Sequence, residues 1–109
     1  MQITLNIYNK QKEIVKTHTA EGYDLMMGTI EDFMDIIDVE AINDTTALAK
    51  MVIKGYKQIK PLMQDIFPEL TDEEFKGIKL ADLVTVIANT GAAVIENLNI
   101  LKQGNSARA

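Results

Sequence analysis

The sequence predicts a mainly α fold, in which a short N-terminal β-hairpin is followed by a compact bundle of three to five helices. Near the N-terminus polar and apolar residues alternate, and from about residue 23 apolar residues recur every three or four positions. The first pattern has the period of a strand and the second that of an amphipathic helix. The length of 109 residues suits one domain. We assign it to residues 2–101, with the hairpin at 2–19 and a flexible tail at 102–109.

The hairpin is predicted from residues 2–8 and 13–19. The first segment, QITLNIY, alternates, and the second is rich in β-branched residues. Residues 9–12 are polar and suit a turn. A two-stranded hairpin is only marginally stable in water, so we expect the helices to cover its apolar face. That face carries Ile3, Leu5 and Ile7.

Two amphipathic helices are predicted next, over residues 23–38 and 47–67. Thr29 followed by Asp32 resembles a helix start, so we expect the regular part of the first helix to begin there. Pro61 lacks a backbone N–H and crowds the carbonyl four residues earlier, so we expect a kink or a break at this position. The connection between the helices offers three N-cap candidates: Asp44, Thr45 and Thr46.

The segment FPELTDEEFKGIKLADL, residues 67–83, carries the most explicit local signals. Thr71 and Glu74 have the spacing of a capping box, and Leu70 and Phe75 have that of a hydrophobic staple. We therefore expect a short helix, which the following glycine can close.

A final long helix is predicted from about Leu80 to Leu101. Gly91 lies within its apolar stripe and predicts a close approach by another helix. The stripe consists of Leu80, Leu83, Val84, Ile87, Gly91, Val94, Ile95, Leu98 and Leu101.

The net charge of −5 argues against non-specific binding to nucleic acid or to anionic membranes, which both need clustered basic residues. The absence of cysteine excludes disulfides and thiolate chemistry, and it fits a reducing compartment. The N-terminus does not resemble a signal peptide, and no stretch is long and apolar enough to span a bilayer. We therefore expect a cytoplasmic protein.

Residues suited to catalysis are few. His18, the single histidine, has no visible orienting partner, so we interpret it as a solvent-facing or edge-strand residue. Ser106, the one serine, lies in the predicted tail. A run of carboxylates lacks the glycine and the ligand offsets of a calcium loop, and we interpret it as a solvated helix face and loop. It comprises Asp32, Asp35, Asp38, Glu40 and Asp44. We predict no enzymatic activity, no cofactor and no metal site.

The order of these segments resembles the tail assembly chaperones of long-tailed (siphovirus-type) bacteriophages and related prophages. The resemblance covers about residues 2–101. It rests on the hairpin sequence QITLNIYNKQKEIVKTHT, the amphipathic segment YDLMMGTIEDFMDIID soon after it, and a helix that ends in MQDIFPELTDEEFKGIKLADL.

This resemblance implies a non-enzymatic protein of the host bacterial cytoplasm, which binds the phage tape-measure protein, helps to recruit tail-tube subunits and is absent from the mature virion. The expected partners are thus the tape-measure protein and the tail-tube protein, with self-association as a further option. No nucleic acid or membrane is expected to bind. The same fold also suits a structural head–tail connector or tail component, or a bacterial protein-binding regulatory module.

We hypothesise that the tape-measure protein binds by helix-in-groove contacts to an apolar surface rich in flexible methionine side chains. The residues assigned to it are Met26, Met27, Phe33, Met34, Ile37, Ile59, Met63 and Phe67. The alternative for each of them is a place in the core.

Overall fold

The computed structural model describes residues 2–108, apart from the side chains of Tyr23 and of residues 100–108. Strands β1 (Gln2–Tyr8) and β2 (Ile14–Glu21) come first. The helices are α1 (Met27–Ile36), α2 (Thr45–Lys54), α3 (Tyr56–Ile66), α4 (Asp72–Lys76) and α5 (Leu80–Arg108), with short 3-10 turns η1 (Gly22–Asp24) and η2 (Val39–Ala41). The predicted mainly α fold with an N-terminal hairpin is confirmed.

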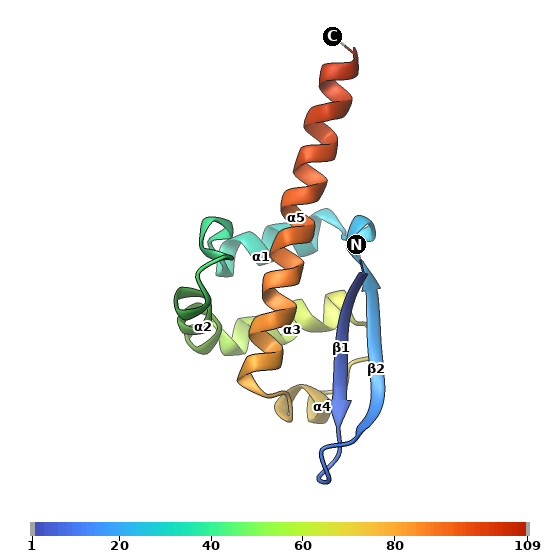
Figure 1. Cartoon of the computed structure of the whole chain (residues 1–109), viewed down its shortest axis with the longest axis vertical. Coiled ribbons are helices and arrows are strands. Elements are labelled where there is room, and N and C mark those ends of the chain that lie inside the picture. The colour runs from blue at the N-terminus through green and yellow to red at the C-terminus, as the bar shows by residue number, and fades with distance from the viewer. Residues whose placement is uncertain (1, 109) are drawn as a thin grey trace.

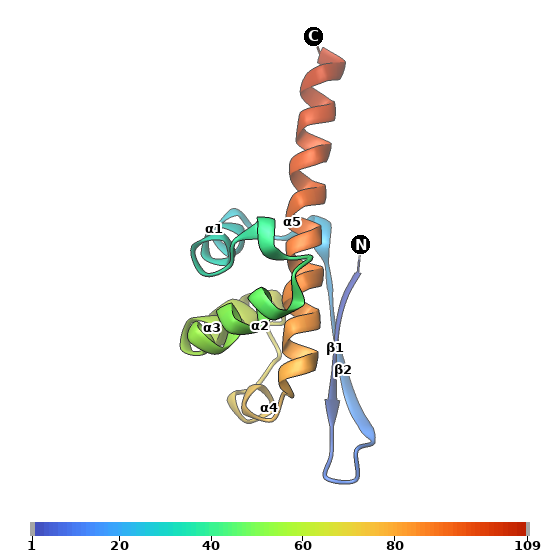
Figure 2. The same cartoon turned by 60° about the vertical axis from the view of Figure 1, so that its left-hand side comes forward.

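Helix α5 forms the axis of the molecule, with the hairpin on one side and α1, α2 and α3 on the other (Figures 1 and 2). The two strands are antiparallel, and Leu5 pairs with His18. Ile3 and Leu5 are buried and Ile7 packs against the core, so the helices cover the apolar face as expected. At the hairpin turn, Oδ1 of Asn9 accepts backbone N–H bonds from Gln11 and Glu13.

The segment predicted as one helix at 47–67 forms parts of two helices. The helical conformation is interrupted at Gly55 and not at Pro61. Gly55 ends α2 and begins α3, and a Cβ there would lie only 2.9 Å from Cγ2 of Ile36. Pro61 lies inside α3 on an exposed side, where solvent can satisfy the carbonyl that its missing N–H leaves free. The break predicted as one alternative at Pro61 was therefore wrong, and a kink there stays a prediction. Asp44 caps α2, as one of the three candidates, by accepting the N–H of Ala47.

Helix α1 begins at Met27, earlier than the predicted start at Thr29. Thr29 is 7% exposed and lies among the buried residues of α1, so it does not cap the helix. The N-cap residue is Met26, which makes no side-chain capping bond. The spacing of Thr29 and Asp32 suggested a start that the structure does not have, because Thr29 is a buried residue inside the helix.

Helix α4 has the predicted capping box. The hydroxyl of Thr71 accepts the N–H of Glu74 at 3.1 Å, and the carboxylate of Glu74 accepts the N–H of Thr71 at 3.0 Å. Leu70 and Phe75 are both buried, as the hydrophobic staple predicts. Gly77 ends the helix, as expected.

Other segments approach α5 closely at Gly91. A Cβ there would meet Cγ2 of Ile42 at 2.6 Å and Cζ of Phe33 at 3.3 Å, so the predicted close packing is present. Two members of the predicted stripe lie largely outside the core, since Leu80 is 47% and Leu98 is 51% exposed. Leu101 has a side chain outside the described residues.

Helix α5 continues beyond the rest of the molecule (Figure 1). Asn97 marks its last described tertiary hydrogen bond, in which Nδ2 donates to the carbonyl of Gly22 at 2.9 Å. The flexible tail predicted at 102–109 overlaps the end of α5 and Ala109, which lies outside the described residues. Its flexibility stays a prediction.

Candidate partner-binding surfaces

Three methionines on and before α1 are exposed and form what we call the methionine surface: Met26, Met27 and Met34. Their side chains are 77%, 72% and 50% exposed. Met27 and Met34 lie nearly two helical turns apart and therefore share one side of α1. Leu25 and Ile30 are partly buried beneath the same region and join it to the core. The exposed thioethers offer an apolar and adaptable contact area.

The other residues assigned to the binding surface lie in the core. None of them is more than 1% exposed, so in this conformation none can contact a partner. They are Phe33, Ile37, Ile59, Met63 and Phe67. The sequence pattern grouped them with the methionines because core and surface apolar residues share one helical period.

Leu98 extends the apolar region toward the free end of α5. It lies nearly two turns beyond Gly91 and so on the same side of α5, the side that contacts Phe33 of α1. At a rise of 1.5 Å per residue, Leu98 lies about 10 Å further along α5 than Gly91. Both views show α5 continuing past α1 in this direction (Figures 1 and 2). Exposed or half-exposed apolar side chains therefore lie on both α1 and α5 near the place where these two helices meet.

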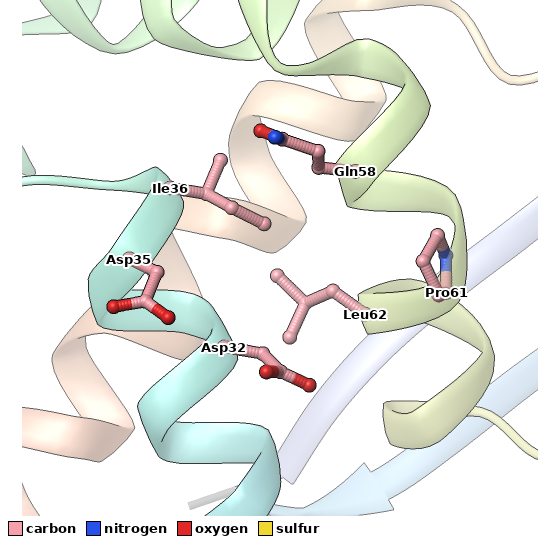
Figure 3. A pocket seen from close by; sticks show the side chains of 6 residues that line it. All are labelled: Asp32, Asp35, Ile36, Gln58, Pro61 and Leu62. Atoms are coloured by element: carbon pink, nitrogen blue, oxygen red, sulfur yellow. The ribbon is translucent and has the colours of Figure 1, made fainter.

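A groove lies between α1 and α3, which we call the α1–α3 groove, with a volume of about 300 Å³. Figure 3 shows Asp32, Asp35 and Ile36 on α1, facing residues of α3 across the groove. The α3 side consists of Gln58, Pro61 and Leu62. At 100° per residue, Asp32 lies about 140° around the helix from Met27. The groove and the methionine surface therefore occupy different sides of α1.

The floor of the groove is apolar and its α1 wall is acidic. Leu62 is buried and Ile36 is partly buried, whereas Asp32 and Asp35 are exposed. Among the described residues, no ion pair engages either carboxylate. The solvated acidic face predicted from the sequence is therefore present. Its position beside an apolar groove was not predicted from the sequence. The i, i+3 spacing of the two aspartates is the signal that placed them on one face.

His18 is buried, so the solvent-facing alternative was wrong. The edge-strand alternative holds, because β2 belongs to a two-stranded sheet. Its Nε2 lies 3.3 Å from Oε1 of Glu74, and its ring centroid lies 6.0 Å from that of Phe67. Lys16 of the same strand lies 3.7 Å from the other oxygen of Glu74. This cluster joins the hairpin to α4. Successive side chains of a strand point to opposite faces, so Lys16 and His18 lie on the same face of β2.

Hydrogen bonding lowers the pKa of the Glu74 carboxyl group. The backbone N–H of Thr71, which donates to this carboxylate, holds its pKa below the usual value; burial opposes this shift, and Lys16 and His18 support it. The pKa of Asp72 is also lowered, by a hydrogen bond from Gln64 and by Lys60. Both carboxylates therefore stabilise α4 and its contacts in the ionised form.

Comparison of the chain with protein-family models, with curated proteins and with solved structures finds no match. Over the part of the chain that the structure describes, no helix is both long and apolar enough to cross a membrane. Within the same residues, no group of three or more histidine, aspartate or glutamate side chains is placed to hold a metal ion.

Proposed function

We propose that this chain is a non-enzymatic assembly chaperone of a long-tailed bacteriophage or prophage, which binds the tape-measure protein and helps to recruit tail-tube subunits. The observation that supports it best is the methionine surface on α1. A monomeric protein rarely leaves several large apolar side chains together in solvent without a partner for them. The sequence resemblance supplies the identity of that partner.

The chemistry of the surface suits an amphipathic helix. A helix contacts a partner through apolar residues spaced three or four apart, and flexible methionines adapt to the shapes of such residues. A tape-measure protein is long and helical, and its apolar stripes need cover until tail-tube subunits surround it. A chaperone with an apolar contact area and an acidic exterior would keep it in solution and would act in the host cytoplasm.

The test is co-expression of this chain with the tape-measure protein, taken as the longest helix-rich protein encoded just downstream. Co-purification and the solubility of the partner are the two measurements. We expect the wild-type chain to keep the partner soluble and to co-purify with it. The double variant Met27→Asp/Met34→Asp should no longer bind the partner, although its own melting temperature should be unchanged.

A matched control is Ile14→Asp/Ile53→Asp. These isoleucines are 55% and 62% exposed and lie on β2 and α2, so the variant adds the same charge to exposed apolar positions elsewhere. It should retain the partner. Equal loss in both variants, or a wild-type chain without effect on the partner, would contradict the proposal. Discrete rings of this chain, or its presence in purified particles, would favour the structural tail component instead.

A further inference from the structure

We propose that the α1–α3 groove binds an arginine side chain presented by the helical partner of this chain. This inference rests on the proposed function, since the partner supplies the arginine. The groove lies on a different side of α1 from the methionine surface. A partner that engages both would therefore hold α1 from two sides.

The size of the groove suits one long side chain. Its volume of about 300 Å³ lies at the small end of the range found for sites that enclose whole small molecules. Ile36, Pro61 and Leu62 supply apolar contacts. The methylene stem of an arginine can pack along such contacts while its charged head stays at the polar rim.

The charges around the groove favour a cation. Asp32 and Asp35 offer only acceptor oxygens when ionised, and Gln58 on the opposite wall offers an amide oxygen. No lysine or arginine lines the groove, so the acidic wall has no cationic partner from this chain among the described residues. Figure 3 shows both carboxylates on the α1 side of the groove, one after the other along the helix. A planar guanidinium with several N–H donors suits this arrangement better than the point charge of a lysine.

Two unusual backbone positions shape the groove. Gly55 lets Ile36 approach the corner between α2 and α3, because any Cβ there would meet Cγ2 of Ile36 at 2.9 Å. Pro61 stands inside α3 although an interior proline costs a helix about 3 kcal/mol. Its ring is exposed, so burial in the core does not offset this cost. A place in the wall of a binding groove accounts for both the proline and its exposure.

The direct test measures binding of a synthetic helix-forming peptide with one central arginine, flanked by leucine one turn away on each side. The matched peptide carries citrulline, which has nearly the same shape and no charge. Fluorescence anisotropy gives the dissociation constant of each peptide for the full chain. We expect the arginine peptide to bind about tenfold more tightly, as a charged hydrogen-bonded contact requires.

Two double variants locate the effect. Asp32→Asn/Asp35→Asn removes the acidic wall, and Glu31→Gln/Glu40→Gln removes the same charge from exposed positions that do not line the groove. Only the first should reduce binding of the arginine peptide to the level of the citrulline peptide. NMR amide shifts caused by the arginine peptide should centre on Asp32, Ile36 and Leu62. Equal affinity for the two peptides, equal loss in the two variants, or shifts centred elsewhere would overturn the inference.

Co-expression with the tape-measure protein separates this inference from the proposed function. If the partner co-purifies equally well with Asp32→Asn/Asp35→Asn and with wild type, the groove is not an arginine site for it and the inference fails, while the chaperone proposal stands. If the arginine peptide binds in the groove but the wild-type chain ignores the tape-measure protein, the chaperone proposal fails and the groove remains an arginine site for another helical protein.

Discussion

Helices α4 and α1 differ in how far their own local sequence defines where they begin. Helix α4 has five residues, yet a reciprocal capping box closes its first turn and its one aromatic side chain is 2% exposed. Helix α1 has ten residues, no side-chain cap at its first turn, and apolar side chains on both its buried and its exposed sides. The short helix therefore gains stability from local bonds and burial together, whereas the longer one depends on its neighbours in space.

This difference bears on function. Leu70 and Phe75, the staple residues beside the capping box of α4, are buried in the core, so changes there should alter stability first. In α1, Phe33 anchors the helix in the core, while Met27 and Met34 contribute little to it. A surface that adds little to stability but stays apolar is the one to examine for binding.

Phe75→Ala in α4 should have the largest effect. Phe75 is 2% exposed and stacks on Tyr56 at a centroid distance of 5.1 Å, so truncation leaves a cavity in the core. We expect the free energy of unfolding to fall by about 3–5 kcal/mol in urea titrations followed by circular dichroism. Met27→Ala in α1 is the control and should change it by less than about 0.5 kcal/mol. Similar losses in both variants would remove the distinction between the two helices.

Two glycine substitutions probe how tightly α1 is held. Gly91→Ala puts a Cβ 2.6 Å from Cγ2 of Ile42 and 3.3 Å from Cζ of Phe33, and we expect it to destabilise the fold by about 1–3 kcal/mol. Gly28→Ala in α1 meets nothing within 4 Å. It should stabilise the fold by up to about 1 kcal/mol, because alanine is the better helix former. Thermal melts of the two variants measure both signs, and stabilisation by Gly91→Ala would show that α1 is loosely packed on α5.

The smallest expected effect is the pH dependence that Glu74 contributes. Its folded-state pKa lies below the usual value of 4.5, so the ionised form stabilises the fold at pH values above 4.5. This stabilisation is lost as the pH falls below 4.5 and through the lower folded-state pKa. Glu74→Gln should therefore be less stable than wild type at pH 7, and the difference should shrink at low pH.

Melting temperatures measured from pH 7 down to pH 3 test this prediction. Glu31→Gln on the exposed side of α1 is the control, and its difference from wild type should not follow the same trend. A constant difference for Glu74→Gln at every pH would mean that the ionised carboxylate adds nothing to the contact between hairpin and α4.

Local spacing alone determined several elements. The alternation at 2–8 defined β1, and the four residues around Thr71 defined the start of α4, because each of these signals acts over one turn or one strand. Asp44 was one of three candidates, and the structure selected it as the cap of α2. The apolar stripe around Gly91 also predicted close packing, since a missing side chain among apolar neighbours leaves room for another element.

The remaining features depend on contacts between segments that are far apart in the sequence. Gly55 lies where α2 ends and α3 begins, and Ile36 of α1 occupies the space that a Cβ at Gly55 would need. His18 is buried where β2 contacts Phe67 and Glu74, residues that are distant from it in the sequence. The same holds for the candidate surfaces. The apolar pattern of α1 includes Met34, Phe33 and Ile37 alike, and the packing of α1 on α3 and against Gly91 of α5 leaves Met34 exposed and buries the other two. Periodicity reports which residues can share a face, but the neighbours of that face decide which of them remain open to a partner.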